Sequence, residues 1–199
     1  MSNIRAARME EAVRASGDWY FVDIGFSRSS KTCGLLEGDG EPQLLTFAAL
    51  QSRMIAIAGT VSPPANIVIE APLSVAFGAS GNPVGRSVES RGGQSRYWYV
   101  GLGCSVLVAA TYLLRALSES AIQREVRLFE GLVSFKQKGV ASSHAADVRS
   151  LRSVVWGLPG NGRIVPSEEL AASEEHVVKS AFAVAGMNYG VPPVVLVGT

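Results

Sequence analysis

The stretch WYFVDIGF at residues 19–26 is rich in aromatic and β-branched side chains, with turn-forming residues beside it. This pattern predicts a β-strand. A second apolar run, NIVIE at 66–70, is short enough to be a buried strand of the parallel type. Each run carries a carboxylate, since Asp23 lies inside the first and Glu70 ends the second. Because burying an unpaired carboxylate is costly, each needs either a function or a partner such as an arginine or a helix start.

Turn residues and apolar spacing around these two strands predict the rest of the fold. Predicted strands cover 19–26, 32–36, 43–47, 66–70, 125–128 and 191–197, and predicted helices cover 3–16, 47–58, about 99–118 and 144–156, with one more starting near Ser167. A leading antiparallel meander is thus followed by strands that helices connect. That order predicts an α/β domain with a mixed sheet flanked by helices.

Composition narrows the class of protein further. The chain has 199 residues, 47% hydrophobic and 18% charged, so it can bury a core and is neither disordered nor fibrous. The net charge is only +1, so the protein as a whole is not basic. A surface that binds nucleic acid would therefore have to be a local cluster of basic residues. Cys33 and Cys104 fit no disulfide framework or zinc pattern, which favours a reducing compartment. Without a run of about 20 apolar residues or an apolar signal region, we expect a cytoplasmic protein with no membrane partner.

A third acidic feature accompanies Asp23 and Glu70. His144 and Asp147 are three residues apart, which places them on one face of a predicted helix's first turn. Alone, this pair is explained by the helix macrodipole. Glu125 and Glu130 are candidate auxiliary carboxylates, although a solvated strand edge explains them better.

Taken together, these segments resemble a known family. The segment DIGFSRSSKTCG at 23–34 resembles the first-strand motif of RuvC-type Holliday junction resolvases, Asp-x-Gly followed by a turn and Thr-x-Gly. IVIE at 67–70 is similar to their second acidic strand, and HAADV at 144–148 to their closing helix. Asp23 and Glu70 are 47 residues apart, and Glu70 and Asp147 are 77 residues apart. These spacings are also similar to those of the family. The resemblance covers about 19–156 and extends to a broader group of uncharacterised nucleases with a ribonuclease-H fold.

The resemblance implies a fold and a division of the chain. It implies a ribonuclease-H-like mixed sheet over 18–158, preceded by an N-terminal helical extension at 1–17. Residues 159–199 are then a C-terminal helix–strand extension of the same domain. Neither extension belongs to a minimal resolvase.

The resemblance also implies a chemistry, metal-dependent hydrolysis of phosphodiester bonds in structured or single-stranded nucleic acid. Two Mg²⁺ or Mn²⁺ ions roughly 4 Å apart would activate water and neutralise the leaving oxygen. Asp23 would bridge both ions, Glu70 would hold one, and Asp147 with His144 would hold the other. His144 could instead orient the water.

Substrate contacts are expected from the glycine- and serine-rich segment 77–96 and the aromatic residues after it. We expect residues 78–95 to be mobile, because few apolar anchors are present. Arginine pairs with phosphate and aromatic rings stack on unpaired bases. The candidate nucleic-acid contacts are Arg86, Arg91, Arg96, Trp98, Lys136 and Lys138. The alternative is a surface loop that leads into a core-facing aromatic helix start. DNA is favoured over RNA as partner, and a homodimer is left open.

Two other functions stay open. The segment 23–34 also resembles the phosphate-binding hairpin of actin-like ATPases and sugar kinases, which need two lobes where this chain provides one. A ribonuclease-H-like module without catalysis, serving as a binding or scaffold unit, is the other alternative. A nuclease centre would bind Mg²⁺ or Mn²⁺ without nucleotide, an ATPase would need nucleotide, and a scaffold would do neither.

Overall fold

The computed structural model describes residues 3–25, 31–99, 101–133, 143–160 and 162–198. Its centre is an eight-stranded sheet whose main path runs β11-β13-β10-β5-β2-β3-β4, with β1 paired to β10. The strands of this sheet are β1 (Ile4–Ala6), β2 (Asp18–Ile24), β3 (Cys33–Glu37), β4 (Gln43–Leu45), β5 (Ala65–Glu70), β10 (Val126–Leu132), β11 (Gly162–Val165) and β13 (Val194–Val197). The predicted α/β class with a mixed sheet is therefore confirmed, and its arrangement is compatible with a ribonuclease-H-like fold.

The direction of the strands decides where functional residues can gather. β2, β3 and β4 form the predicted antiparallel meander, whereas β5 runs parallel to β2, and β10 runs parallel to β5. The carboxyl ends of β2, β5 and β10 therefore lie at the same edge of the sheet. Asp23 and Glu70 both stand at this edge.

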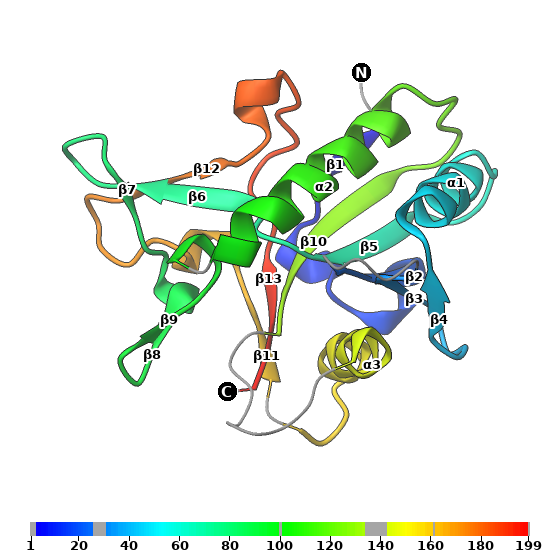
Figure 1. Ribbon diagram of the computed structural model, residues 1–199, viewed down its shortest axis with the longest axis horizontal. Helices are drawn as coiled ribbons and strands as arrows, with labels where there is room; N and C mark the ends of the chain where they lie inside the picture. The colour runs from blue at the N-terminus through cyan, green and yellow to red at the C-terminus, as the bar shows by residue number, and fades with distance from the viewer. Residues whose placement is uncertain (1–2, 26–30, 100, 134–142, 161, 199) are drawn as a thin grey trace.

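Helices cover both faces of the sheet (Figure 1). α1 (Phe47–Ala58) and α2 (Gly101–Ser118) pack on one face, and α3 (His144–Val155) packs on the other against β2, β3 and β13. Strand alternation divides the core accordingly. Tyr20 and Val22 point toward α1 and α2, while Trp19 and Phe21 point toward α3.

Helix α2 is apolar and long enough that, by length and composition alone, it could cross a membrane. Its inner side is buried against the sheet through Leu113, Leu114 and Leu117. Core helices of soluble proteins show the same composition, so the helix carries no information about location.

The predicted N-terminal helix over 3–16 is wrong. Residues Ile4–Ala6 form β1, which pairs in parallel with the start of β10, and two 3₁₀ turns follow, η1 (Met9–Glu11) and η2 (Arg14–Ser16). β13 pairs with the later half of β10, so strands from both ends of the chain share one edge. Pairing with a ready sheet edge outweighs the weak helical spacing of so short a segment.

The segment 77–96 contains more structure than the sequence predicts. The short elements here are β6 (Ser74–Phe77), β7 (Pro83–Val84), η3 (Ser87–Glu89), β8 (Ser90–Arg91), β9 (Gln94–Ser95) and η4 (Tyr97–Tyr99), and β6 also pairs with β12 (Val177–Ser180). Val88 is buried, so the expectation that 78–95 lacks apolar anchors is wrong at its centre. The helix predicted near Ser167 is only the 3₁₀ turn η5 (Ser167–Glu169), and a further turn, η6 (Ala183–Ala185), precedes β13.

Candidate functional site

Asp23 and Glu70 are neighbours across the two central strands. Register pairs Asp23 of β2 with Glu70, the last residue of β5. Paired residues on adjacent strands are about 4.8 Å apart at Cα and point to the same face. That face is the one covered by α3, because Phe21 and Val68, two positions earlier on each strand, both pack against it. Asp23 is only 4% exposed and Glu70 is half-buried, so two carboxylates share a small, partly enclosed space.

His144 comes to this pair from the start of α3. Ser143 caps the helix, its hydroxyl accepting a hydrogen bond from the amide of Ala146 at 3.2 Å. The imidazole Nδ1 then lies 2.7 Å from Oδ2 of Asp23. Because a carboxylate oxygen accepts, Nδ1 carries the proton in this bond, and Nε2 is an acceptor in the neutral imidazole. The His144 side chain is 35% exposed while that of Asp23 is 5% exposed, so the imidazole stands between the carboxylate and solvent.

Two glycines allow this close approach. A Cβ built on Gly25 would lie 2.2 Å from Cε1 of His144, and one on Gly34 would lie 2.8 Å from the His144 carbonyl oxygen. Gly34 is also the register partner of Asp23 on β3. The glycines of the Asp-x-Gly and Thr-x-Gly motifs therefore have a direct physical role, since they let the start of α3 lie against the acidic strand.

Asp147 is one helical turn beyond His144 on the same helix. It is half-buried and precedes Val148 and Leu151, the residues that α3 buries against the sheet. The four predicted site residues thus belong to one edge and one face of the sheet. Within the residues that the structure describes, no three His, Cys, Asp or Glu side chains form a group able to hold a metal ion. A complete protein cage for a metal is therefore not preformed among them.

The prediction that Arg86 contacts nucleic acid is wrong. It is 1% exposed, and its guanidinium binds Glu130 Oε1 at 2.7 Å and Glu89 Oε1 at 3.1 Å. It also donates to the hydroxyl of Ser74 at 2.6 Å. Burial alone would lower the pKa of Arg86, but the charges of Glu130 and Glu89 raise it, so the guanidinium stays charged. Arg86 is committed to a buried ion-pair network and cannot reach a phosphate.

Glu130 fits neither interpretation considered for it, because it is fully buried on a central strand and so is not on a solvated strand edge. Its register partner is Ile69, so its side chain points to the face covered by α1 and α2, away from Asp23. One carboxylate oxygen accepts from the amide of Leu73 at 2.8 Å. Burial raises the pKa of its neighbour Glu89. Glu125, the other auxiliary candidate, lies near the start of β10 and pairs with Arg5 and Arg127, as the solvated-edge interpretation expects.

Tyr97 also belongs to this network and agrees with the alternative interpretation, a core-facing aromatic start of the helix. It is buried, has φ of 57°, and its hydroxyl donates to the carbonyl of Gly131. Its ring faces the Arg86 guanidinium with 5.9 Å between Cζ and the ring centroid. Burial, and then the negative charge of Glu70, raise its pKa well above the usual value. The only local signal was its place in the run Tyr97-Trp98-Tyr99, which also fits a surface aromatic patch.

The remaining predicted contacts divide into three groups. Arg91 is exposed, and Arg96 is half-buried, donating to Gln94 Oε1 at 2.8 Å. Trp98 is half-buried, and its indole Nε1 donates to the carbonyl of Ser74 at 3.1 Å. Lys136 and Lys138 lie outside the described residues.

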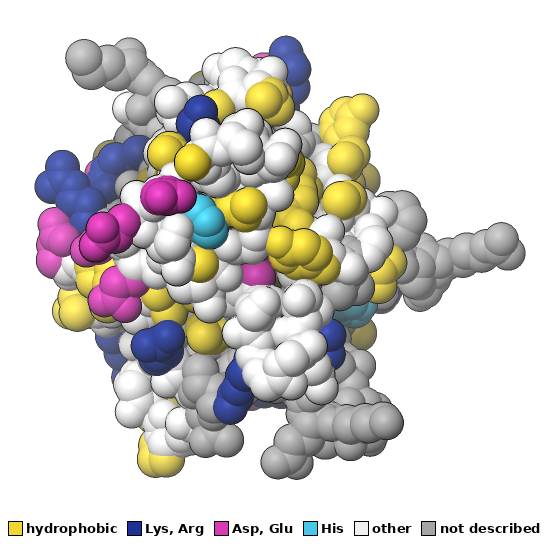
Figure 2. Space-filling view, turned by 90° about the vertical axis from the view of Figure 1, so that its left-hand side faces the viewer, with side chains coloured by type: hydrophobic (Ala, Val, Ile, Leu, Met, Phe, Trp, Pro, Cys, Tyr) yellow, Lys and Arg dark blue, Asp and Glu magenta, His cyan; other side chains and the backbone are white. Residues whose placement is uncertain are grey.

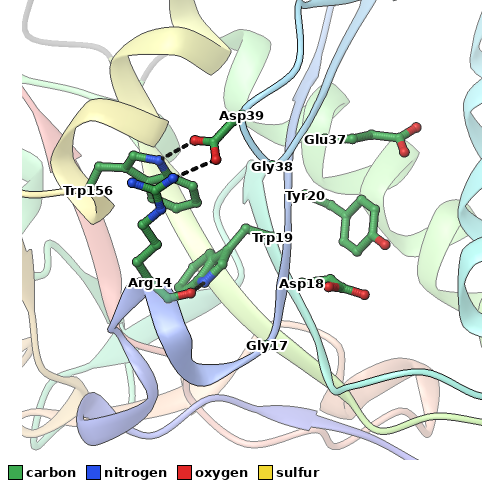
Figure 3. Close-up of a pocket in the computed structure, with 9 residues that line it drawn as sticks. All are labelled: Arg14, Gly17, Asp18, Trp19, Tyr20, Glu37, Gly38, Asp39 and Trp156. Atoms are coloured by element: carbon green, nitrogen blue, oxygen red, sulfur yellow. Dashed lines mark hydrogen bonds and ion pairs between the residues drawn. The ribbon is translucent and has the colours of Figure 1, made fainter.

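A separate cavity of about 290 Å³ lies at the other end of β2 (Figure 3). Asp39 accepts there from Trp156 Nε1 at 2.9 Å and pairs with Arg14 at 2.5 Å. These interactions lower the pKa of Asp39, the bond from Trp156 having the larger effect. Because this cavity begins around Gly17–Tyr20 whereas Asp23 is near the carboxyl end of the strand, it is not part of the acidic site.

Comparison with known proteins adds no family assignment. No protein-family model matches this chain, and no curated protein matches it. The interpretation of the site therefore rests on its geometry.

Proposed function

We propose that this protein is a nuclease that hydrolyses phosphodiester bonds of nucleic acid with Mg²⁺ or Mn²⁺. The observation that carries the proposal is the register of Asp23 with Glu70, together with the hydrogen bond from His144 to Asp23. Two carboxylates and an imidazole at the carboxyl edge of a sheet are suited to acid–base chemistry on a charged substrate.

The donor set fits a magnesium ion. Mg²⁺ prefers oxygen ligands, keeps several waters, and is commonly bound by one or two carboxylates together with phosphates of the substrate. Asp23 and Glu70 would hold the ion, with Asp147 as a further oxygen donor from α3. Such a site needs no complete protein cage before substrate arrives, so the lack of a three-ligand group among the described residues agrees with it. When bound, divalent cations supply an activated water and neutralise charge on the leaving oxygen.

His144 has two roles in this proposal. Its Nδ1–H bond fixes the orientation of the Asp23 carboxylate, and its Nε2 is left as an acceptor for a proton from water. The two glycines support both roles by fixing where the ring lies. His144 is accordingly a proton acceptor and a positioning residue, whereas Asp23 and Glu70 bind the ion.

The test is cleavage of labelled single-stranded, duplex and branched DNA, and of RNA, in the presence of Mn²⁺. Wild-type protein should cleave at least one of these substrates, and excess EDTA should abolish the cleavage. Asp23→Asn and Glu70→Gln should reduce it to background. Glu125→Gln, a change of the same kind at the other end of the sheet, should leave it unchanged. Equal cleavage by Asp23→Asn and wild type would refute the proposal.

A further inference from the structure

A small hairpin projects from the body of the molecule (Figure 1). β8 and β9 pair in register, Ser90 with Ser95 and Arg91 with Gln94, around the glycines 92 and 93. Both glycines have positive φ, 53° and 76°, as a tight two-residue turn between antiparallel strands requires. All six residues of the hairpin are exposed.

The root of this hairpin is fixed to the protein core. Glu89, immediately before it, is buried and paired with Arg86, and the amide of Arg96, immediately after it, donates to the Glu89 carbonyl at 3.0 Å. Tyr97 then attaches the returning strand to Gly131 of β10. Several buried hydrogen bonds join Arg86 to Glu89, Glu130 and Ser74, so the root of the hairpin is held in a defined direction.

The same network joins the root of the arm to the segment that follows β5. Ser74, which binds both Arg86 and the Trp98 indole, lies four residues after Glu70 along the chain. The negative charge of Glu70 is close enough to act on Tyr97 at the foot of the arm.

The arm is suited to an anionic partner that also presents flat rings. Between residues 90 and 99 there are two arginines and no acidic residue. Elsewhere on the face that Figure 2 shows, basic side chains are scattered, with hydrophobic side chains and a group of acidic ones between them. The arm thus provides a small number of phosphate contacts and no broad basic surface of the kind that binds long duplex DNA.

Tyr99 provides the aromatic surface at the base of the arm. It is 57% exposed, and its ring lies directly against Gly85, where a Cβ would come within 3.0 Å of the hydroxyl. An aromatic ring that is fixed in place and open to solvent is the usual stacking platform for an unpaired base.

We infer that the β8–β9 hairpin and Tyr99 form a binding arm for single-stranded nucleic acid, with Arg91 and Arg96 on phosphates and Tyr99 stacked on a base. The inference rests on the proposed nuclease function and specifies its substrate as an unpaired strand. A binding role for the hairpin also gives a reason for the buried ion pairs of Arg86 with Glu89 and Glu130 at its root.

The experiment measures binding of a fluorescent oligothymidine by anisotropy in EDTA, and cleavage of the same oligonucleotide in Mn²⁺. Tyr99→Ala should raise the dissociation constant by about fivefold or more. Arg91→Gln should weaken binding and lower the salt dependence, log K against log salt, by about 0.7. Tyr112→Ala on α2 and Arg163→Gln on β11 change equally exposed residues of the same types and should bind as wild type does.

Separate outcomes distinguish this inference from the nuclease proposal. Binding that depends on Tyr99 and Arg91 without any cleavage would support the arm and refute the nuclease. Cleavage by wild type with unchanged binding in Tyr99→Ala and Arg91→Gln would refute the arm and leave the nuclease standing. Tighter binding of a blunt duplex than of the oligothymidine would also overturn the choice of an unpaired strand.

Discussion

Arg86, Glu89 and Glu130 lie on the face of the sheet covered by α1 and α2, and Asp23 and Glu70 lie on the face covered by α3. On the first face the charged side chains are fully buried and bind one another through several hydrogen bonds. On the second face, Asp23 is bonded to an imidazole that is one-third exposed, and Glu70 is half-buried. Glu130 stands near the carboxyl end of β10, and Asp23 and Glu70 stand near the carboxyl ends of β2 and β5.

The two groups show how a carboxylate that stabilises the fold differs from one that is placed to bind a ligand. A buried pair whose charges and hydrogen bonds are satisfied internally has no capacity left for a ligand. The Asp23–Glu70 pair differs in exposure, since the His144 side chain beside Asp23 is 35% exposed and Glu70 is half-buried. From the sequence, Arg86 was expected at the substrate and Glu130 at a solvated strand edge, so neither was expected in a buried network.

The largest effect is expected for Arg86→Ala. This change leaves Glu89 and Glu130 buried without their cation, so the free energy of unfolding should fall by about 3–5 kcal/mol. Urea unfolding measures it, with Arg91→Ala as the exposed control, expected within about 0.5 kcal/mol of wild type. An Arg86→Ala protein as stable as wild type would remove the distinction between the two faces.

His144 tests the functional face. His144→Ala should lower cleavage about a hundredfold or more, the usual contribution of a positioned acid–base group, with little change in the urea midpoint. His144→Asp should keep more activity than His144→Ala, because a carboxylate can also accept a proton from water. Wild-type rates in both variants across the pH range would exclude His144 from the site.

Gly34→Ala tests whether the approach of α3 to the acidic strand matters. The added methyl group meets the backbone of His144, so stability should fall by about 1–3 kcal/mol and cleavage should fall with it. Gly101→Ala is the matched control, since a Cβ there meets nothing within 4 Å. Reduced stability with full activity would show that the glycine serves packing only.

The smallest effect concerns a third charged group, which attaches β1 to the sheet and is less buried than the Arg86 network. Partial burial favours a higher pKa for Glu11, but its hydrogen bonds with Arg5 and the Arg8 amide, and the charge of Arg127, lower it below 4.5. A carboxyl with a lowered folded-state pKa stabilises the fold above its unfolded pKa and loses that contribution as pH falls. We therefore expect faster amide exchange at Ile4–Ala6 below about pH 4.5 in wild type, once corrected for intrinsic rates.

Glu11→Gln provides the control for that measurement. It should show faster exchange in β1 already at neutral pH and a weaker dependence on acid. Unchanged exchange in the variant would mean that backbone pairing with β10 alone holds β1.

The central elements were predictable because local pattern and tertiary role agree there. The apolar run around Asp23, the hairpin after it, α1 and α3 are all found close to their expected bounds. Register pairs Asp23 with Glu70, and His144 bonds to Asp23, so three of the residues chosen from the resemblance are neighbours. In these strands and helices, the apolar residues that favour the element locally are also the residues that pack it against the sheet or its helices.

The errors arise where a distant partner decides the structure. Arg86 looks like a surface arginine among glycines, and only Glu130, 44 residues later, makes it a core residue. Residues 3–16 have helical spacing, but β10 offers Ile4–Ala6 an edge to pair with. No pattern within either segment reveals these partners.

The most direct measurement of the central claim is Mn²⁺ binding, followed by the electron paramagnetic resonance signal of the free ion, with and without a non-cleavable phosphorothioate oligonucleotide. The account predicts that wild-type protein and Glu125→Gln remove Mn²⁺ from solution, more so with the oligonucleotide, and that Asp23→Asn does not. Failure of the wild-type protein to bind Mn²⁺ under either condition, or equal binding by Asp23→Asn, would contradict it.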